Sequence, residues 1–155
     1  MVETDLDWVI KTEKSCYDFP WSKKGFEKVL DDGLAYIFCN RQGERLGYAC
    51  FMSVLDEIHL LNIAVNPVYQ QQAVATNALP LLIKHFQSLD FKTMFLEVRK
   101  SNPVIKLYQA NNFKIDGIRK GYYPVNMALN QQGKPVKEDA ILMSCLLNHT
   151  PLGTF

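Results

Sequence analysis

The chain has few cysteines, almost no net charge and no long apolar run, and each shortage narrows what it can do. Its four cysteines among 155 residues include no C-x-x-C pair, so neither a disulfide framework nor a metal site is expected. The net charge of +1 provides no strong field toward nucleic acid or an anionic membrane, so neither is expected as a direct partner. No apolar run reaches the roughly 18 residues that a membrane-spanning helix needs.

The remaining composition is that of an ordinary globular protein. Apolar residues make up 48% of the chain and charged residues 21%, which is typical of soluble proteins. A chain of 155 residues can bury a substantial core, so we expect one domain over residues 1–155. The segment Met1 to Asp5 is acidic and lacks the basic-then-apolar pattern of a signal peptide, so we expect a cytoplasmic protein.

Hydrophobic periodicity predicts a mixed α/β (α+β) fold. Antiparallel hairpins come first and a strand–helix–strand unit follows. The third strand is apolar throughout, so it is expected to be buried on both faces. Ser22 is expected to cap the second helix. The predicted helices are 4–16, 22–30, 74–89 and 103–111, the predicted strands are 34–39, 46–55, 58–65, 93–98, 113–119 and 140–147, and Asn126 to Lys137 is predicted to be a mobile loop.

Pro80 conflicts with the third predicted helix. A proline in a helix interior removes a hydrogen bond and costs roughly 3 kcal/mol. The helix must therefore begin later than residue 74 or be kinked.

The segment from Leu60 to Thr76 carries the clearest functional signal. An apolar strand ends at Val65, Asn66-Pro67 and a short polar loop follow, and a long helix begins. This arrangement aims the free N–H groups at the start of the helix toward any anion at the end of the strand. We therefore expect an anion to bind at this helix start.

Six segments resemble, in order, the GCN5-related N-acetyltransferase superfamily and within it the RimI group, the bacterial ribosomal-protein-alanine N-acetyltransferases. They run from residue 19 to residue 143 and cover nearly the whole chain. The loop resembles the pyrophosphate loop Q/R-x-x-G-x-G/A of the superfamily at both ends, with Ala73 in place of the central glycine. The loop and the principal marks are Gln70 to Ala75, Phe19-Pro20-Trp21-Ser22, Asn62-Ile63-Ala64-Val65, Leu96-Glu97-Val98-Arg99, Tyr122-Tyr123-Pro124 and Glu138-Asp139-Ala140.

The resemblance implies a GNAT-like mixed, mostly antiparallel sheet with helices on both faces, and acetyl-CoA as co-substrate without a metal. It makes Glu97 the general base and Tyr108 the general acid. Backbone groups of the third strand would pair with the pantetheine arm like an added strand. The implied coenzyme-binding residues are Ile63, Ala64, Val65, Gln71, Gln72, Ala73, Val74, Ala75, Thr76 and Asn102.

Each of these residues also has a purely structural explanation. Glu97 could be the salt-bridge partner of Arg99 or a lysine, Tyr108 a core tyrosine, and Asn102 the cap of the helix that begins at Pro103. At a positive φ, Ala73 costs on the order of 1 kcal/mol relative to glycine, and at a negative φ it costs nothing.

By resemblance, the favoured acceptor is the N-terminal alanine of a small-subunit ribosomal protein. An α-amino group has a pKa of about 7.7–8.0 and a lysine about 10.4, so a carboxylate can deprotonate a chain terminus at pH 7. Tyr122-Tyr123 is either an acceptor-side feature or an edge packing pair. Two alternatives remain: a related enzyme for a lysine or small polyamine, and a catalytically weak binding module with the same fold. The sequence leaves the oligomeric state open.

Overall fold

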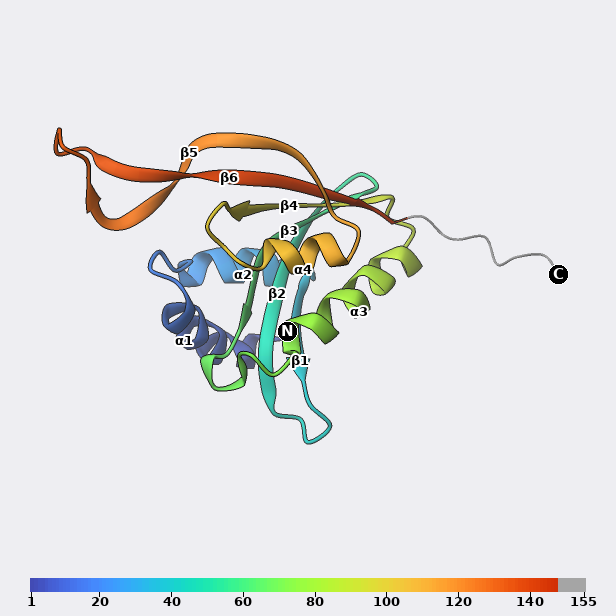
Figure 1. Ribbon diagram of the computed structural model, residues 1–155. Helices are drawn as coiled ribbons and strands as arrows, with labels where there is room; N and C mark the ends of the chain where they lie inside the picture. The colour runs from blue at the N-terminus through green and yellow to red at the C-terminus, as the bar shows by residue number, and fades with distance from the viewer. Residues whose placement is uncertain (148–155) are drawn as a thin grey trace.

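The computed structural model describes residues 1–147, in which six strands form one sheet in the order β1-β2-β3-β4-β6-β5 (Figure 1). All neighbouring strands are antiparallel except β3 and β4. The predicted mixed, mostly antiparallel sheet is therefore confirmed. The elements are α1 (Leu6–Cys16), α2 (Lys23–Asp31), β1 (Ala35–Cys39), β2 (Arg45–Val54), β3 (Glu57–Val65), α3 (Val74–Ser88), β4 (Thr93–Arg99), α4 (Ile105–Ala110), β5 (Lys114–Leu129) and β6 (Pro135–Leu146), with 3₁₀ turns at Glu3–Asp5 and Pro67–Tyr69.

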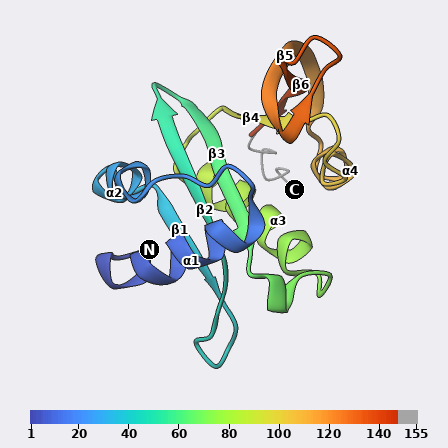
Figure 2. The ribbon, with the colours of Figure 1, turned by 90° about the vertical axis from the view of Figure 1, so that its left-hand side faces the viewer.

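Helices cover both faces of the sheet (Figure 2). On one face, Val9 of α1 and Phe26 of α2 are fully buried against Tyr48 of β2. On the other face, Leu79 and Phe86 of α3 belong to a larger cluster that includes strand residues of β2, β3, β4 and β6. Each helix therefore buries one apolar stripe, as its sequence period requires.

Two helix starts test the expectations from the sequence. The Ser22 hydroxyl accepts the N–H of Gly25 at 3.3 Å, so the predicted cap of α2 is confirmed. Helix α3 begins at Val74 and continues through Pro80, so it does not start later. Pro80 is exposed, which lets water satisfy the carbonyl that loses its helical partner.

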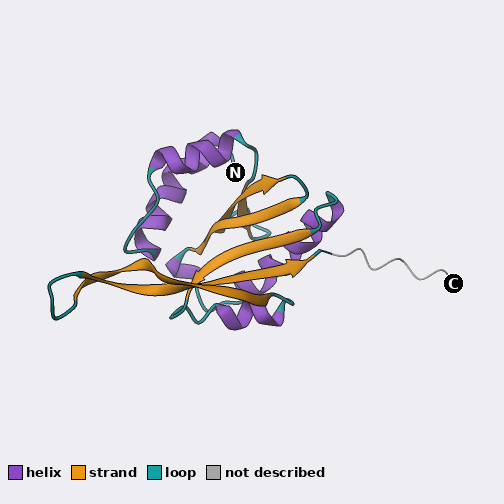
Figure 3. Ribbon diagram, turned by 90° about the horizontal axis from the view of Figure 1, so that it is seen from above, coloured by secondary structure: helices purple, strands orange, loops and turns teal. Residues whose placement is uncertain are grey.

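The prediction of a mobile loop from Asn126 to Lys137 is wrong. Strand β5 continues to Leu129 and β6 begins at Pro135, which makes a long hairpin that projects beyond the rest of the sheet (Figure 3). The Asn130 side chain accepts the N–H of Gln132 and of Lys134, both at 2.9 Å, and so closes the turn. A projecting hairpin needs no alternation of apolar and polar residues, so its sequence looks like a loop.

The prediction that β3 is buried on both faces is also wrong. Burial alternates along the strand, and Leu61 is 41% exposed. The register between β2 and β3 shifts opposite Leu61, and β4 pairs only with Glu57–Leu60 of β3. The second half of β3 therefore diverges from β4, and the gap between the two strands opens the sheet. Within residues 1–147, no helix has the length and apolar character to span a membrane.

Candidate active site

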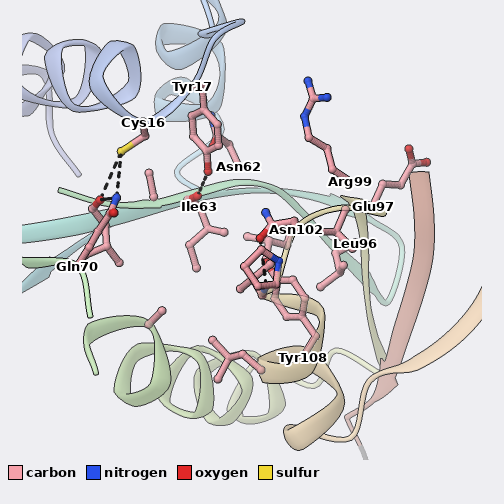
Figure 4. Close-up of a pocket in the computed structure, with 18 of the residues that line it drawn as sticks. Cys16, Tyr17, Asn62, Ile63, Gln70, Leu96, Glu97, Arg99, Asn102 and Tyr108 are labelled. Atoms are coloured by element: carbon pink, nitrogen blue, oxygen red, sulfur yellow. Dashed lines mark hydrogen bonds between the residues drawn. The ribbon is translucent and has the colours of Figure 1, made fainter. Parts of the chain in front are cut away.

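A cleft of about 930 Å³ lies where β3 and β4 diverge (Figure 4). This volume is in the range of small-molecule and cofactor sites. The ends of β3 and β4, the start of α3, helix α4, the loop after α1 and the β5–β6 hairpin all contribute to its wall. Of the predicted site residues, Gln72 alone does not line the cleft, because its side chain donates to the Val68 carbonyl at 3.0 Å. The lining residues among them are Ile63, Ala64, Val65, Gln71, Ala73, Val74, Ala75, Thr76, Glu97, Asn102 and Tyr108.

The loop before α3 has an unusual backbone. Ala73 has φ 59° and ψ 19°, and Gln71 has φ 60°, both in the left-handed region. Of the two alternatives for Ala73, the positive φ is therefore the one observed. The first N–H groups of a helix have no partner within the helix, and the first turn of α3 carries no acidic side chain. This end of the cleft can therefore hold an anion.

We expect Ala73→Gly to raise the free energy of unfolding by about 1 kcal/mol, since glycine adopts a left-handed backbone without the steric cost that alanine incurs. The matched variant Ala75→Gly, inside the first turn of α3, should lower it by about 0.5–1 kcal/mol. Urea denaturation measures both. A loss of stability in Ala73→Gly as large as in Ala75→Gly would contradict the strain at Ala73.

The open edge of β3 already has side-chain partners. The Tyr17 hydroxyl donates to the Ile63 carbonyl, and the Gln70 amide donates to the Val65 carbonyl at 3.0 Å (Figure 4). Cys16 Sγ lies 3.4 Å from the same Val65 oxygen. These contacts come from side chains, since no strand of the sheet pairs with this part of β3 on the β4 side. Sequence reasoning missed Tyr17, although it stands in an aromatic-rich segment that is a signal of binding.

A buried carboxylate anchors the loop after α1. Glu13 is 1% exposed and accepts the backbone N–H of Trp21 at 2.8 Å, the Asn62 amide at 3.1 Å and the Tyr48 hydroxyl. The network joins α1, the loop, β2 and β3, and its polar groups are satisfied although they are buried. Sequence reasoning missed this role, for which an acidic residue on the apolar face of a predicted helix is the signal.

Glu97 projects from the end of β4, and its carboxylate lies 2.9 Å from the Arg119 guanidinium of β5. Glu97 therefore does form a salt bridge, as one explanation from the sequence proposed, but its partner is Arg119 and not Arg99 or a lysine. The Arg119 guanidinium also lies 4.6 Å from the centre of the Tyr122 ring. These contacts fix the direction in which the carboxylate points.

Arg99 forms a second and similar arrangement. Its guanidinium is 2.9 Å from Glu138 and 4.6 Å from the centre of the Tyr123 ring. The Tyr122 and Tyr123 rings meet edge-on, with centroids 5.0 Å apart. Tyr123 lines the cleft with Glu97, so the hairpin contributes an aromatic and charged wall there.

Tyr108 lies on α4 with 4% of its surface exposed, and its ring is 5.6 Å from that of Phe113. It is thus a core residue that also lines the cleft. Burial, with a smaller contribution from Tyr123, raises the pKa of Tyr108 to about 12. The hydroxyl therefore keeps its proton at any physiological pH.

Asn102 supports the turn before α4. Its side-chain oxygen accepts the N–H of Val104 at 3.0 Å. Helix α4 begins at Ile105, two residues later than predicted, so Asn102 caps this turn and not the helix itself. Because the same residue lines the cleft, the structural and functional explanations are compatible.

Comparison with known proteins identifies the class. Residues 6–113 match the acetyltransferase (GNAT) family. The ribosomal protein bS18-alanine N-acetyltransferase of Escherichia coli (strain K12) is 34% identical over 142 residues, or 91% of this chain and 90% of that protein. Its counterpart from Haemophilus ducreyi is 33% identical over 150 residues, or 95% and 97% of the two chains.

The crystal structure of the ribosomal-protein-S18-alanine N-acetyltransferase from Escherichia coli has the same fold. Its TM-score is 0.84 at 32% identity, and the match covers 100% of this chain and 96% of that one. The chain belongs to the acetyltransferase (GNAT) family and is an N-acetyltransferase.

Proposed function

We propose that the protein transfers an acetyl group from acetyl-CoA to the α-amine of the N-terminal alanine of a small-subunit ribosomal protein. We further propose that the whole chain acts as one catalytic domain. The cytoplasmic location of the protein stays a prediction. The observation that carries the proposal is that Glu97 and Tyr108 line one cleft with the open edge of β3. The names of the relatives support the choice of acceptor.

The cleft suits the coenzyme in two respects. The first turn of α3 carries no acidic side chain, and the first N–H groups of a helix have no partner within the helix, which suits a pyrophosphate held by Gln71 to Thr76. The β3 segment from Ile63 to Val65 has no strand beside it in β4, which suits an extended pantetheine arm with Asn102 opposite. When bound, acetyl-CoA supplies a thioester as the acetyl donor.

The charged form of an amine cannot attack a carbonyl carbon. Glu97 accepts the proton of the α-ammonium group, either directly or through one water. A backbone N–H of the Ile63–Val65 segment polarises the acetyl carbonyl. The nitrogen loses its second proton to solvent as the tetrahedral intermediate collapses. Tyr108 stays protonated until then, gives its proton to the sulfur as the carbon–sulfur bond breaks, and recovers a proton from solvent. The cleft thus contains one proton acceptor and one proton donor for the reaction.

The acceptor wall offers aromatic rings and carboxylate oxygens to a chain terminus. Glu97 and Glu138 are each paired with an arginine, and the two guanidinium groups also contact the Tyr122 and Tyr123 rings, so the wall carries no net negative charge and its aromatic rings favour an aromatic residue of the acceptor. An α-amine is also neutral at pH 7 far more often than a lysine.

We expect a peptide with a free N-terminal alanine, followed by basic and aromatic residues, to be acetylated at its α-amine. Chemical blocking of that amine should abolish transfer and leave internal lysines unmodified. Mass spectrometry locates the acetyl group. Acetylated lysines in the blocked peptide at a comparable rate would favour the lysine or polyamine alternative.

The binding-module alternative has its own test. The loop lacks the family glycine at Ala73 and has Gln71 and Thr76 where basic side chains are usual, so these positions offer a phosphate only neutral donors. We propose that acetyl-CoA still binds, because helix and loop amides supply most of the attraction. In a thermal-shift titration, the Tm of the protein should rise as acetyl-CoA is added. A flat curve at millimolar acetyl-CoA would favour the binding module.

A further inference from the structure

A second hollow of about 380 Å³ lies next to the cleft, between α2 and the β2–β3 hairpin. Most of its surface is apolar, and Lys28 of α2 and Asp32, the residue that follows this helix, contribute polar groups to its wall. The apolar lining residues are Trp21, Val29, Phe51, Met52 and Leu61.

The hollow and the cleft share a wall. Trp21 and Leu61 line both of them. Trp21 is fixed by its N–H bond to Glu13 at 2.8 Å and by its ring, which lies 5.4 Å from that of Phe26. Leu61 stands where the β2–β3 register shifts. A chain that leaves the cleft over Leu61 therefore enters a pre-formed apolar space.

The lining of the hollow is only partly covered by the protein itself. Met52 is 42% exposed and Leu61 is 41% exposed, and Phe19 in the adjacent loop is 48% exposed. Grouped apolar side chains beside a binding cleft commonly mark a contact surface. Covering such a surface with another apolar side chain lowers the free energy of the complex.

We propose that this hollow is a subsite for an apolar or aromatic side chain of the acceptor polypeptide, downstream of the residue whose α-amine is acetylated. The proposal rests on the proposed function, because the occupant is the same acceptor chain. An extended chain advances about 3.3–3.6 Å per residue, so a few residues carry it across Leu61. Lys28 and Asp32 of opposite charge both stand at the wall, so the apolar lining and not a net charge selects the side chain. The hollow thereby adds specificity beyond the first residue.

The test is Met52→Lys, which places a charge in the hollow without touching the catalytic groups. The acceptors are a peptide of about eight residues that begins with free alanine and carries downstream aromatic residues, and its two-residue N-terminal fragment. We expect kcat/KM for the long peptide to fall about tenfold or more, as lost burial of one apolar side chain predicts. The value for the fragment and the acetyl-CoA Kd should not change.

Leu81→Lys is the matched control. Leu81 is 67% exposed on α3 and lines neither the cleft nor the hollow, so this variant should behave like the wild type. An alanine scan of the long peptide adds a coupling measurement. Alanine at one downstream position of the peptide should lower kcat/KM about tenfold with the wild-type enzyme. The same substitution should lower it much less with the Met52→Lys enzyme.

Equal kcat/KM for the long peptide in Met52→Lys and Leu81→Lys would overturn the subsite. Equal losses for the long peptide and the fragment would also overturn it, because they would show a general defect. A wild-type protein that acetylates no peptide α-amine would remove the proposed function and the subsite with it. These outcomes are distinguishable, since the last one is seen without any variant.

Discussion

Glu97→Gln should lower kcat by roughly 10²- to 10⁴-fold, the usual contribution of a positioned general base. Glutamine keeps the size of the side chain and one oxygen for Arg119, which lies 2.9 Å from the carboxylate, so the fold and the acetyl-CoA Kd should not change. Steady-state kinetics with the free-alanine peptide measures the loss. Wild-type turnover in this variant would rule Glu97 out as the base.

The dependence of this loss on pH provides a second check. An α-amino group has a pKa of about 7.7–8.0, so above pH 9 it is mostly neutral without help from the enzyme. The deficit of Glu97→Gln should therefore shrink between pH 7 and pH 9.5. Glu44→Gln is the control, because Glu44 is exposed in the β1–β2 turn, where its carboxylate accepts from Asn40 at 2.6 Å. That variant should keep the wild-type rate at every pH.

Tyr108→Phe should also lower kcat by about 10²- to 10⁴-fold, with little effect on acetyl-CoA affinity. Phenylalanine keeps the packing against Phe113, whose ring centroid is 5.6 Å away, and removes only the hydroxyl. Since the pKa of Tyr108 is raised to about 12, its ionisation should cause no fall in the wild-type rate between pH 7 and pH 10. The measurement is kcat against pH for both proteins.

Tyr36→Phe is the matched control for this prediction. Tyr36 is a half-buried tyrosine of β1, and its hydroxyl lies 3.1 Å from His85, away from the cleft lining. This variant loses a hydroxyl of the same kind and should keep its turnover. A similar loss of rate in both variants, or none in Tyr108→Phe, would contradict the role of general acid.

The sequence alone predicted most of the elements, because the signals that define them are local. The apolar stripe of α1 and the Ser22 cap of α2 depend on residues within one or two turns. The same holds for the strand, loop and helix from Leu60 to Thr76, where the resemblance drew attention to the segment and the helix start predicted an anion site. The order of the motifs along the chain also led to the hypothesis that Glu97 and Tyr108 act in the same active site.

Tertiary structure decided the features that depend on residues far apart in the chain or on exact backbone angles. Arg119 of β5 reaches Glu97 of β4 across β6, because the register of both strands on β6 places these residues near one another. No local pattern indicates that order or register of strands. The positive φ of Ala73 could not be predicted, because alanine is compatible with either sign at different cost. The second hollow exists because packing brings Trp21, from the loop before α2, and Leu61 of β3 to one wall. Local sequence thus determined the elements, and only their packing determined which side chains face one another.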